Sequence, residues 1–413
     1  MANIPLQTVP VDEPIGQAKA NYTPALASLA TLYFMMGFIT CLNDTLVPFF
    51  KKGFNLTYSQ SSLVQFYFFL TYGIMSIPAG KIVDKVGYKT GMVLGFAIAA
   101  LGAILFFPAS AFHLYPLFLA ALFVIAIGIV LLQVAANPYI TVLGPARTAS
   151  SRLTLIQGVG SIGTTVAPLF GAYFILAPLA HAPSEAVRYP YLGIAVLLAL
   201  IAVVVWQLRL PVIKAGADAE QADNVVGRSA FSFRNLRFGI WGIFCYVGAE
   251  VSIGTFLTNY IADTLHISEN EANSFVAFYW GSMLVGRFVG ALVLKTIKPS
   301  IILVACAALA ITLVAVSINA TGYLVVWTMI AVGLCNSIMF AIIFSLSVDR
   351  LGSFTTQASG LLSTAIAGGA VVSYGQGLLI DRFTWPVAFM LPIICYAYIL
   401  FFGINGYKPT RSY

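Results

Sequence analysis

The chain has 413 residues, of which 60% are apolar and only 8% are charged, with a mean hydropathy of +0.93. Soluble domains carry about 25% charged residues, so this composition excludes a soluble enzyme and a disordered protein. The apolar runs also lack the strict alternation of a membrane β-barrel strand. The sequence therefore predicts a helical protein that crosses a membrane many times.

The net charge of +7 does not indicate a nucleic-acid partner, because the 21 basic residues lie mostly in short connectors between apolar runs. The five cysteines all fall inside apolar runs, without metal-ligand spacing. We therefore expect no nucleic acid, no metal and no cofactor.

Twelve spans are predicted when each crossing takes about 20 apolar residues. In chain order they cover residues 25–50, 60–83, 90–108, 115–142, 153–177, 190–208, 237–262, 272–295, 300–319, 323–348, 356–380 and 386–406. A polar stretch separates the sixth span from the seventh. We expect an all-α membrane protein with a six-helix bundle at 1–209, a linker at 210–235 and a second six-helix bundle at 236–413.

The distribution of lysine and arginine predicts the orientation, since cytoplasmic loops carry more of both. With both termini in the cytoplasm, only four of the 21 basic residues lie outside: Lys51, Lys52, Arg188 and Arg382. We expect cytoplasmic termini in a bilayer-embedded, multi-pass protein.

Span 1 holds Asn43 and Asp44, followed one turn later by Pro48. Asp44 and Glu250, in the equivalent span 7, are the acidic residues that lie well inside predicted spans. A carboxylate at the bilayer centre costs about 2.5–3.5 kcal/mol on insertion scales, so it normally faces a cavity or a partner. Both residues are therefore candidates for proton coupling, and a permanent structural hydrogen bond is the alternative for each.

The loop after span 2 reads GKIVDKVGYK (80–89) and resembles the signature loop of the major facilitator superfamily. Asp84 can cap or pair with a neighbouring helix end, while the glycines allow close approach and a tight turn. We predict a gate here, with an ordinary positively charged loop as the alternative. The gating residues of this loop are Gly80, Asp84, Lys85, Gly87 and Lys89.

A weaker counterpart, GRFVG (286–290), occupies the equivalent place in span 8 and adds Arg287 to the gating residues. The segments around 142–168 and 350–373 also share a Leu-Gly, a short polar loop and a helix rich in small residues. Repeated six-helix halves are the layout of major facilitator transporters. We therefore expect two pseudo-symmetric bundles, the major facilitator fold.

Span 4 carries Gln133 and, one turn later, Asn137, so both amides lie on one helix face. Span 5 adds Gln157. Amides donate and accept hydrogen bonds, which suits the hydroxyls of a neutral polyol. Packing between helices is the alternative for each amide taken singly, whereas three helices with amides favour a binding cavity.

Longer strings carry a closer resemblance. They are CLNDTLVPFF (41–50), QVAANPYITVLG (133–144), GTTVAPLFGAY (163–173), YVGAEVSIG (246–254) and CNSIMFAIIFSL (335–346). Through most of both halves the chain is similar to the fucose:proton symporter family, and within it to the bacterial glucose/galactose porter branch.

This resemblance implies a transporter that imports a hexose together with protons by alternating access, in the bacterial inner membrane and as a monomer. In the fucose permease, an aspartate of helix 1 and a glutamate of helix 4 serve proton coupling and sugar recognition. By motif the aspartate is Asp44, but the glutamate position holds Gln133, which cannot titrate. Gly160 replaces a usual asparagine, opening space or removing a hydrogen bond, and Ala341 replaces a usual proline.

The predicted substrate-binding residues are Asn43, Gln133, Asn137, Gln157, Tyr279 and Asn336. The sequence leaves open whether the sugar is glucose, galactose, N-acetylglucosamine, mannose or fucose, and whether sodium replaces the proton. A drug/proton exporter is disfavoured because span 5 lacks the Gly-Pro-x-x-Gly-Gly run of exporters. A sugar sensor and a membrane enzyme are further alternatives, disfavoured by short tails and by scattered histidines.

Overall fold

The computed structural model describes residues 23–53, 63–171, 173–174, 187–208 and 230–408, except for some side chains, including all those of 43–53. The N-terminal half consists of α1 (Thr23–Gly53), α3 (Leu63–Val86), α4 (Tyr88–Ile104), α5 (Phe106–Ala111), α6 (Tyr115–Val142), η1 (Ala146–Thr148), α7 (Ala149–Gly171) and α8 (Arg188–Gln207).

The C-terminal half begins with η5 (Ala230–Ser232). It continues with α9 (Arg234–Leu265), α10 (Glu269–Val293), α11 (Pro299–Asn319), α12 (Leu324–Asn336), α13 (Met339–Val348), η6 (Gly352–Phe354), α14 (Thr355–Thr364), η7 (Ala365–Ala367), α15 (Gly368–Arg382), α16 (Trp385–Phe401) and the π-helical turn η8 (Phe402–Gly406). Most of the predicted linker, residues 209–229, lies outside the described residues, so the domain boundaries stay a prediction.

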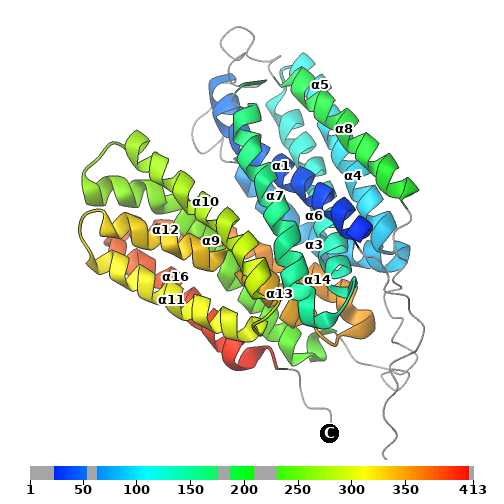
Figure 1. Ribbon diagram of the computed structural model, residues 1–413. Coiled ribbons are helices and arrows are strands. Elements are labelled where there is room, and N and C mark those ends of the chain that lie inside the picture. Colours follow the sequence, from blue (N-terminus) through cyan, green and yellow to red (C-terminus); the bar gives the residue numbers. More distant parts are fainter. Residues whose placement is uncertain (1–22, 54–62, 172, 175–186, 209–229, 409–413) are drawn as a thin grey trace, which may run out of the picture.

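Each of the twelve predicted spans coincides with one helix or with consecutive helices. Within the described ranges, nine helical segments are long and apolar enough to cross a membrane. α1, α3 and α7, with 31, 24 and 23 residues, occupy the positions of predicted spans 1, 2 and 5. The all-α membrane fold in two six-helix bundles is thus confirmed (Figure 1).

Four predicted spans are divided. Span 3 consists of α4 and α5, span 10 of α12 and α13, span 11 of α14, η7 and α15, and span 12 of α16 and η8. At the second break, the Ser337 carbonyl accepts a hydrogen bond from Arg287 Nε at 3.3 Å. A break frees backbone groups that hydrocarbon cannot satisfy, so this side chain stabilises the interruption.

The two halves pack by the same scheme. α1 lies against α7 as α9 lies against α15, and α4 lies against α6 as α11 lies against α12. Glycines allow the closest of these contacts, since a Cβ at Gly163 of α7 would lie 2.1 Å from the Phe34 carbonyl oxygen of α1. In the C-terminal half, a Cβ at Gly368 would lie 2.3 Å from the Phe244 carbonyl oxygen. Small residues at such crossings are typical of membrane helices.

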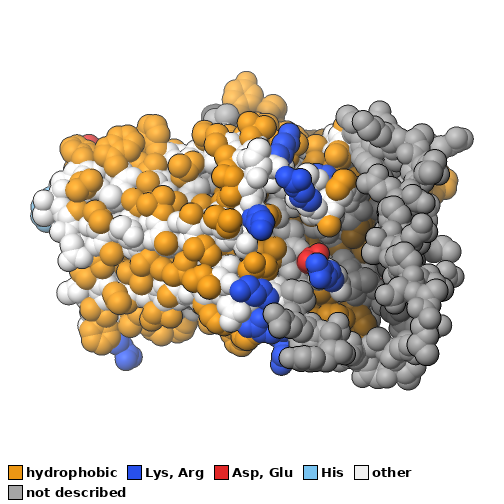
Figure 2. Space-filling model, turned by 60° about the horizontal axis from the view of Figure 1, so that its bottom comes forward, with side chains coloured by type: hydrophobic (Ala, Val, Ile, Leu, Met, Phe, Trp, Pro, Cys, Tyr) orange, Lys and Arg blue, Asp and Glu red, His pale blue; other side chains and the backbone are white. Residues whose placement is uncertain are grey.

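The bundles meet through α3 with α14 and α7 with α10, toward one end of the molecule. There Ser151 Oγ donates to the Ala291 carbonyl at 2.6 Å, and Ser359 Oγ donates to the Val134 carbonyl at 3.0 Å. Figure 1 shows the helices of the two bundles diverging toward the opposite end. Figure 2, which brings the joined end forward, shows lysine and arginine side chains gathered on it.

Candidate functional site

α6 carries the two amides that the sequence places on one helix face. Asn137 is completely buried, and Gln133 is half-buried. Oδ1 of Asn137 accepts a hydrogen bond from the Tyr33 hydroxyl of α1, but its Nδ2 has no partner among the described residues. Oε1 of Gln133 is also buried without a partner there. Because an unpaired buried polar atom costs about 1–3 kcal/mol, this free donor and free acceptor favour a ligand site.

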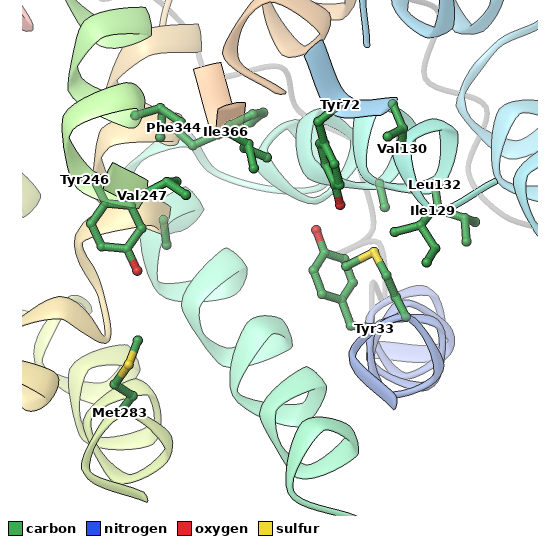
Figure 3. Packing of buried hydrophobic residues seen from close by; sticks show 14 of the residues in the cluster. Tyr33, Tyr72, Ile129, Val130, Leu132, Tyr246, Val247, Met283, Phe344 and Ile366 are labelled. Atoms are coloured by element: carbon green, nitrogen blue, oxygen red, sulfur yellow. The ribbon is translucent and has the colours of Figure 1, made fainter. Parts of the chain in front are cut away.

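Of two tyrosines that the sequence analysis did not single out, Tyr33 is hydrogen-bonded to Asn137, and Tyr72 lies beside Tyr33. Figure 3 shows the hydroxyl groups of Tyr33, on α1, and Tyr72, on α3, turned toward each other between their helices. Both side chains are buried. Membrane tyrosines concentrate at the interfaces, so a tyrosine deep inside a span is the signal that could have identified them. We call Tyr33, Tyr72, Gln133 and Asn137 the amide cluster.

The glycine that replaces the family's asparagine lies at the edge of this cluster. A Cβ at Gly160 would lie 3.1 Å from the Tyr33 carbonyl oxygen. The space next to Gly160 is therefore taken by the backbone of α1 and does not enlarge a cavity. Ala341, the other departure, is completely buried in α13.

The second polar group lies in the C-terminal bundle around Glu250, on α9. The Tyr246 hydroxyl and the positive charge of Arg287 both act on its partly exposed side chain. The Tyr279 hydroxyl, from α10, lies 3.5 Å from the Glu250 carbonyl oxygen. Glu250 thus has polar partners on two helices.

Asn336 extends this group toward α16. Its Nδ2 donates to the Tyr279 hydroxyl at 3.1 Å, and its Oδ1 accepts from the Tyr396 hydroxyl at 2.8 Å. Sequence reasoning missed Tyr246 and Tyr396, which also lie inside spans. The substrate-binding roles of Asn336 and Tyr279 stay a prediction. In this structure both polar atoms of the Asn336 amide are hydrogen-bonded within the C-terminal bundle. We call Tyr246, Glu250, Tyr279, Asn336 and Tyr396 the tyrosine network.

Arg287 connects the tyrosine network with the other bundle. Its Nη1 donates to Ser161 Oγ on α7, while its Nε donates to the Ser337 carbonyl. The guanidinium group therefore lies between the bundles and not in a surface loop. Arg287 thus contacts α7 and the break between α12 and α13, and its charge also acts on Glu250.

The predicted gating loop forms the end of α3 and the start of α4. A Cβ at Gly80 would lie 3.4 Å from the Thr356 carbonyl oxygen of α14, so α3 and the other bundle approach closely there. Gly87 has a φ of 82°, in the left-handed region that favours glycine. Gly87 thus has the turn conformation expected from the motif, and the gating roles of Gly80 and Gly87 stay predictions.

The charged residues of this loop lie at the surface of the joined end. Asp84 and Lys85 are exposed. Nζ of Lys89 donates to the Trp206 carbonyl at the end of α8, at 2.7 Å, so it binds within its own bundle. The gating roles of these three residues stay predictions.

Two further candidates are placed only in part. Asn43 and Asp44 lie on α1, but their side chains fall outside the described residues. Gln157 lies on α7 with a half-buried side chain, and its carbonyl accepts from Ser161 Oγ at 3.0 Å. Among the described residues, no three histidine, cysteine or acidic side chains form a group that could hold a metal ion.

Comparison with known proteins places these features in a family. The model of the Major Facilitator Superfamily matches residues 29–374, which is most of the chain. The chain belongs to the Major Facilitator Superfamily.

Relatives within this superfamily have transporter names. A protein of Brucella abortus biovar 1 named glucose/galactose transporter is 47% identical over 97% of this chain and 99% of its own length. The L-fucose-proton symporter of Escherichia coli K12 is 32% identical over 98% of both chains. The resemblance to the fucose:proton symporter family and its glucose/galactose branch is therefore confirmed, and these relatives are transporters and not enzymes.

A solved structure agrees with both the fold and the arrangement of the bundles. The Major Facilitator Superfamily transporter FucP, crystallised in the outward conformation, superposes with a TM-score of 0.85 at 30% identity, over 93% of this chain and 99% of that one. In the present chain the bundles join at one end and diverge at the other (Figure 1).

Proposed function

We propose that this protein imports a hexose of the glucose/galactose type together with protons, by alternating access of one central site. The names of its relatives and the chemistry of the amide cluster both support this proposal. We place the protein in the bacterial inner membrane as a monomer with both termini in the cytoplasm. The basic side chains at the joined end support this orientation.

The observation that carries the proposal is the free acceptor on Gln133 and the free donor on Asn137, one turn apart on α6. A sugar hydroxyl can donate to Oε1 of Gln133 while a neighbouring hydroxyl accepts from Nδ2 of Asn137. Neither group titrates, which suits a neutral ligand and separates sugar recognition from proton binding. Asn43 and Gln157 are proposed to add contacts from α1 and α7.

Proton coupling is proposed to use the two carboxylates inside the spans, Asp44 and Glu250. Gln133 stands where the fucose permease has a glutamate, so a carboxylate in the C-terminal bundle is a candidate to supply the second titratable group. When Glu250 is ionised, it attracts Arg287; once protonated, it releases that attraction. Because Arg287 also contacts Ser161 of the other bundle, a change in charge at Glu250 can alter how firmly the bundles are joined.

The conformation described here is proposed to be the one that accepts sugar from outside. Gly80 and Asp84, with the serine contacts at the joined end, then form the barrier on the cytoplasmic side, and import requires that barrier to open. The energy scale is sufficient, since one charge crossing 100 mV releases about 2.3 kcal/mol. Tenfold accumulation costs about 1.4 kcal/mol, so one proton supports roughly fifty-fold accumulation.

Uptake into proteoliposomes tests the proposal. Labelled glucose and galactose are supplied with an imposed proton gradient, an imposed sodium gradient or neither, and mannose, N-acetylglucosamine and fucose serve as competitors. We expect uptake above equilibrium only with the proton gradient, and competition between glucose and galactose. Accumulation driven by sodium alone, or no uptake of either hexose by folded protein, would overturn it.

A further inference from the structure

A cavity that is separate from both polar groups lies between the bundles at the joined end. It has a volume of about 1000 Å³, and both halves of the chain line it. Its walls come from the α6–α7, α10–α11 and α13–α14 connections, together with the first residue of α4. It lies beyond the serine contacts between α7 and the C-terminal bundle, and none of the proposed sugar-binding residues lines it.

Basic side chains dominate the lining. Arg147, Lys295, Lys298 and Arg350 line the cavity, against a single carboxylate, Asp349. Asp349 is 3.8 Å from the neighbouring Arg350, which leaves the other three cations without an ion pair within 4 Å in the described part of the chain. The cavity therefore has a surplus of positive charge that a bound anion would neutralise.

The dipoles of two long helices add to this charge. Ala149, the first residue of α7, and Pro299, the first residue of α11, both line the cavity. A helix dipole favours negative charge at the N-terminus. Lysine and arginine side chains gathered around one cavity are the chemistry that binds phosphate groups.

Side-chain hydrogen bonds to backbone carbonyls fix two of the connections that line the cavity. The guanidinium group of Arg152 donates to the Ile140, Thr141 and Pro145 carbonyls, which fixes the α6–α7 connection. On the other side, Nδ2 of Asn235 donates to the Ser347 and Asp349 carbonyls, both at 3.0 Å. The cavity is therefore a built feature and not a gap between loose loops.

We propose that this cavity binds a phosphate-bearing anion, and that its occupation holds the two bundles together at this end. Both bundles line the cavity, so opening this end separates the groups that contact the anion. A ligand that binds one conformation better shifts the equilibrium toward it. In the proposed orientation the cavity faces the cytoplasm, so a phosphorylated sugar on that side would slow further import. The phosphate can belong to a soluble organic phosphate or to a lipid headgroup.

Binding is measured by equilibrium dialysis with the purified full-length protein and labelled glucose 6-phosphate. Saturating unlabelled glucose keeps the probe from the sugar site. Inorganic pyrophosphate serves as a second probe because it contains no sugar, so its binding does not depend on the proposed function. The cavity variant is Lys295→Gln/Lys298→Gln. The control is Arg237→Gln/Lys408→Gln, which removes two exposed charges from residues that do not line the cavity.

We expect saturable binding of both probes that the cavity variant weakens about tenfold or more, since charge-assisted hydrogen bonds are the strong ones. The control should stay within about twofold, because exposed charges outside the site contribute little. Glucose 6-phosphate on the cavity side should also lower the maximal uptake rate of the wild type and not of the cavity variant.

A third arm separates the sources of phosphate. The protein is placed in nanodiscs with neutral lipid alone or with phosphatidylglycerol added. If phosphatidylglycerol displaces the probes from the wild type and from the control variant, but has no such effect on the cavity variant, the site belongs to a lipid headgroup. Absence of saturable binding, or equal weakening in both double variants, would overturn the proposal, and unchanged sugar affinity shows that the cavity variant is folded.

Discussion

In the N-terminal bundle, the amides of Gln133 and Asn137 keep a buried acceptor and a buried donor without partners in the described part of the chain. In the C-terminal bundle, both atoms of the Asn336 amide are bonded to tyrosine hydroxyls. The amide cluster therefore lacks hydrogen bonds that a ligand can supply, whereas the tyrosine network is largely satisfied by itself. This difference is the reason that the proposed sugar site lies mainly in the N-terminal bundle.

The tyrosine network differs from the amide cluster in carrying charge. It contains Glu250 and lies within the field of Arg287, whereas no charged side chain belongs to the amide cluster. A neutral site for the sugar and a charged site connected with the bundle interface can respond to different ligands. Import requires the two sites to be coupled, and Arg287, which donates to Ser161 of the first bundle, is the described contact that connects them.

The largest effect is expected from Asp44, which lies on α1 of the same bundle as the amide cluster. Asp44→Asn should abolish proton-driven accumulation while sugar binding and exchange partly remain, because the amide resembles the protonated acid. Accumulation and counterflow in proteoliposomes measure the two activities. Asp381→Asn, which removes an exposed carboxylate from α15, is the control and should accumulate normally. Wild-type accumulation by Asp44→Asn would remove this residue from the coupling mechanism.

The next largest effect is expected where the charged network meets the other bundle. Arg287→Gln removes the positive charge that acts on Glu250 and the hydrogen bonds to Ser161 Oγ and the Ser337 carbonyl. A hydrogen bond to a charged group contributes about 1.5–3 kcal/mol, so we expect a loss of this order. Thermal unfolding should show lower stability, which Glu250→Gln/Arg287→Gln restores in part. Neither variant should accumulate sugar with a proton gradient. If the single and double variants were equally stable, Glu250 and Arg287 would have no energetically significant interaction.

The amide cluster is tested by Gln133→Ala. One lost hydrogen bond in a desolvated site costs about 1–3 kcal/mol, which weakens sugar binding roughly 5- to 150-fold. The pH profile of transport should not change, because an amide does not titrate. Calorimetric or competition binding of glucose, galactose, mannose, N-acetylglucosamine and fucose to both proteins measures the effect. Unchanged affinity for every sugar would return Gln133 to a role in packing between helices.

Asn336→Ala is the matched test in the other bundle. It leaves the Tyr279 and Tyr396 hydroxyls without this partner, so stability should fall by about 1–3 kcal/mol. Sugar affinity should stay within a few fold, in contrast to Gln133→Ala. Thermal unfolding and sugar binding of the two alanine variants are compared side by side. A larger loss of affinity in Asn336→Ala than in Gln133→Ala would reverse the comparison and make Asn336 a direct sugar ligand, as the sequence predicts.

The helices were predictable because a membrane crossing is recorded locally, in about 20 consecutive apolar residues. α6, for example, has the bounds Tyr115–Val142 that the apolar run predicts. The interruptions at Ser337 and Ala365–Ala367 were not predictable in this way, because neither segment contains a proline or a glycine. The first of them depends on a hydrogen bond from Arg287, on a different helix.

The candidate site was predictable only at the level of residue type. Amides and carboxylates stand out in an apolar span, so Gln133, Asn137 and Glu250 were found. Which of their atoms are free depends on distances between helices, which the sequence does not state. Tyr33 reaches Asn137 because α1 packs closely on α7, a contact in which a Cβ at Gly163 would lie 2.1 Å from the Phe34 carbonyl oxygen. The partner tyrosines thus follow from packing and not from a local motif.

The smallest effect on the sugar site is expected from Asp84, which lies at the joined end, far from both polar groups. It follows Gly80 by one turn and is exposed, while Gly80 packs on α14 of the other bundle. Asp84 lies in the last turn of α3, at the end of the molecule where the bundles join. Asp84→Asn should therefore change the rate of cycling, measured by uptake and exchange, and leave sugar affinity within a few fold. Lys408→Gln, an exposed charge change at the same end, should alter neither. Loss of sugar binding by folded Asp84→Asn would show that the loop communicates with the amide cluster directly and is not a separate gate.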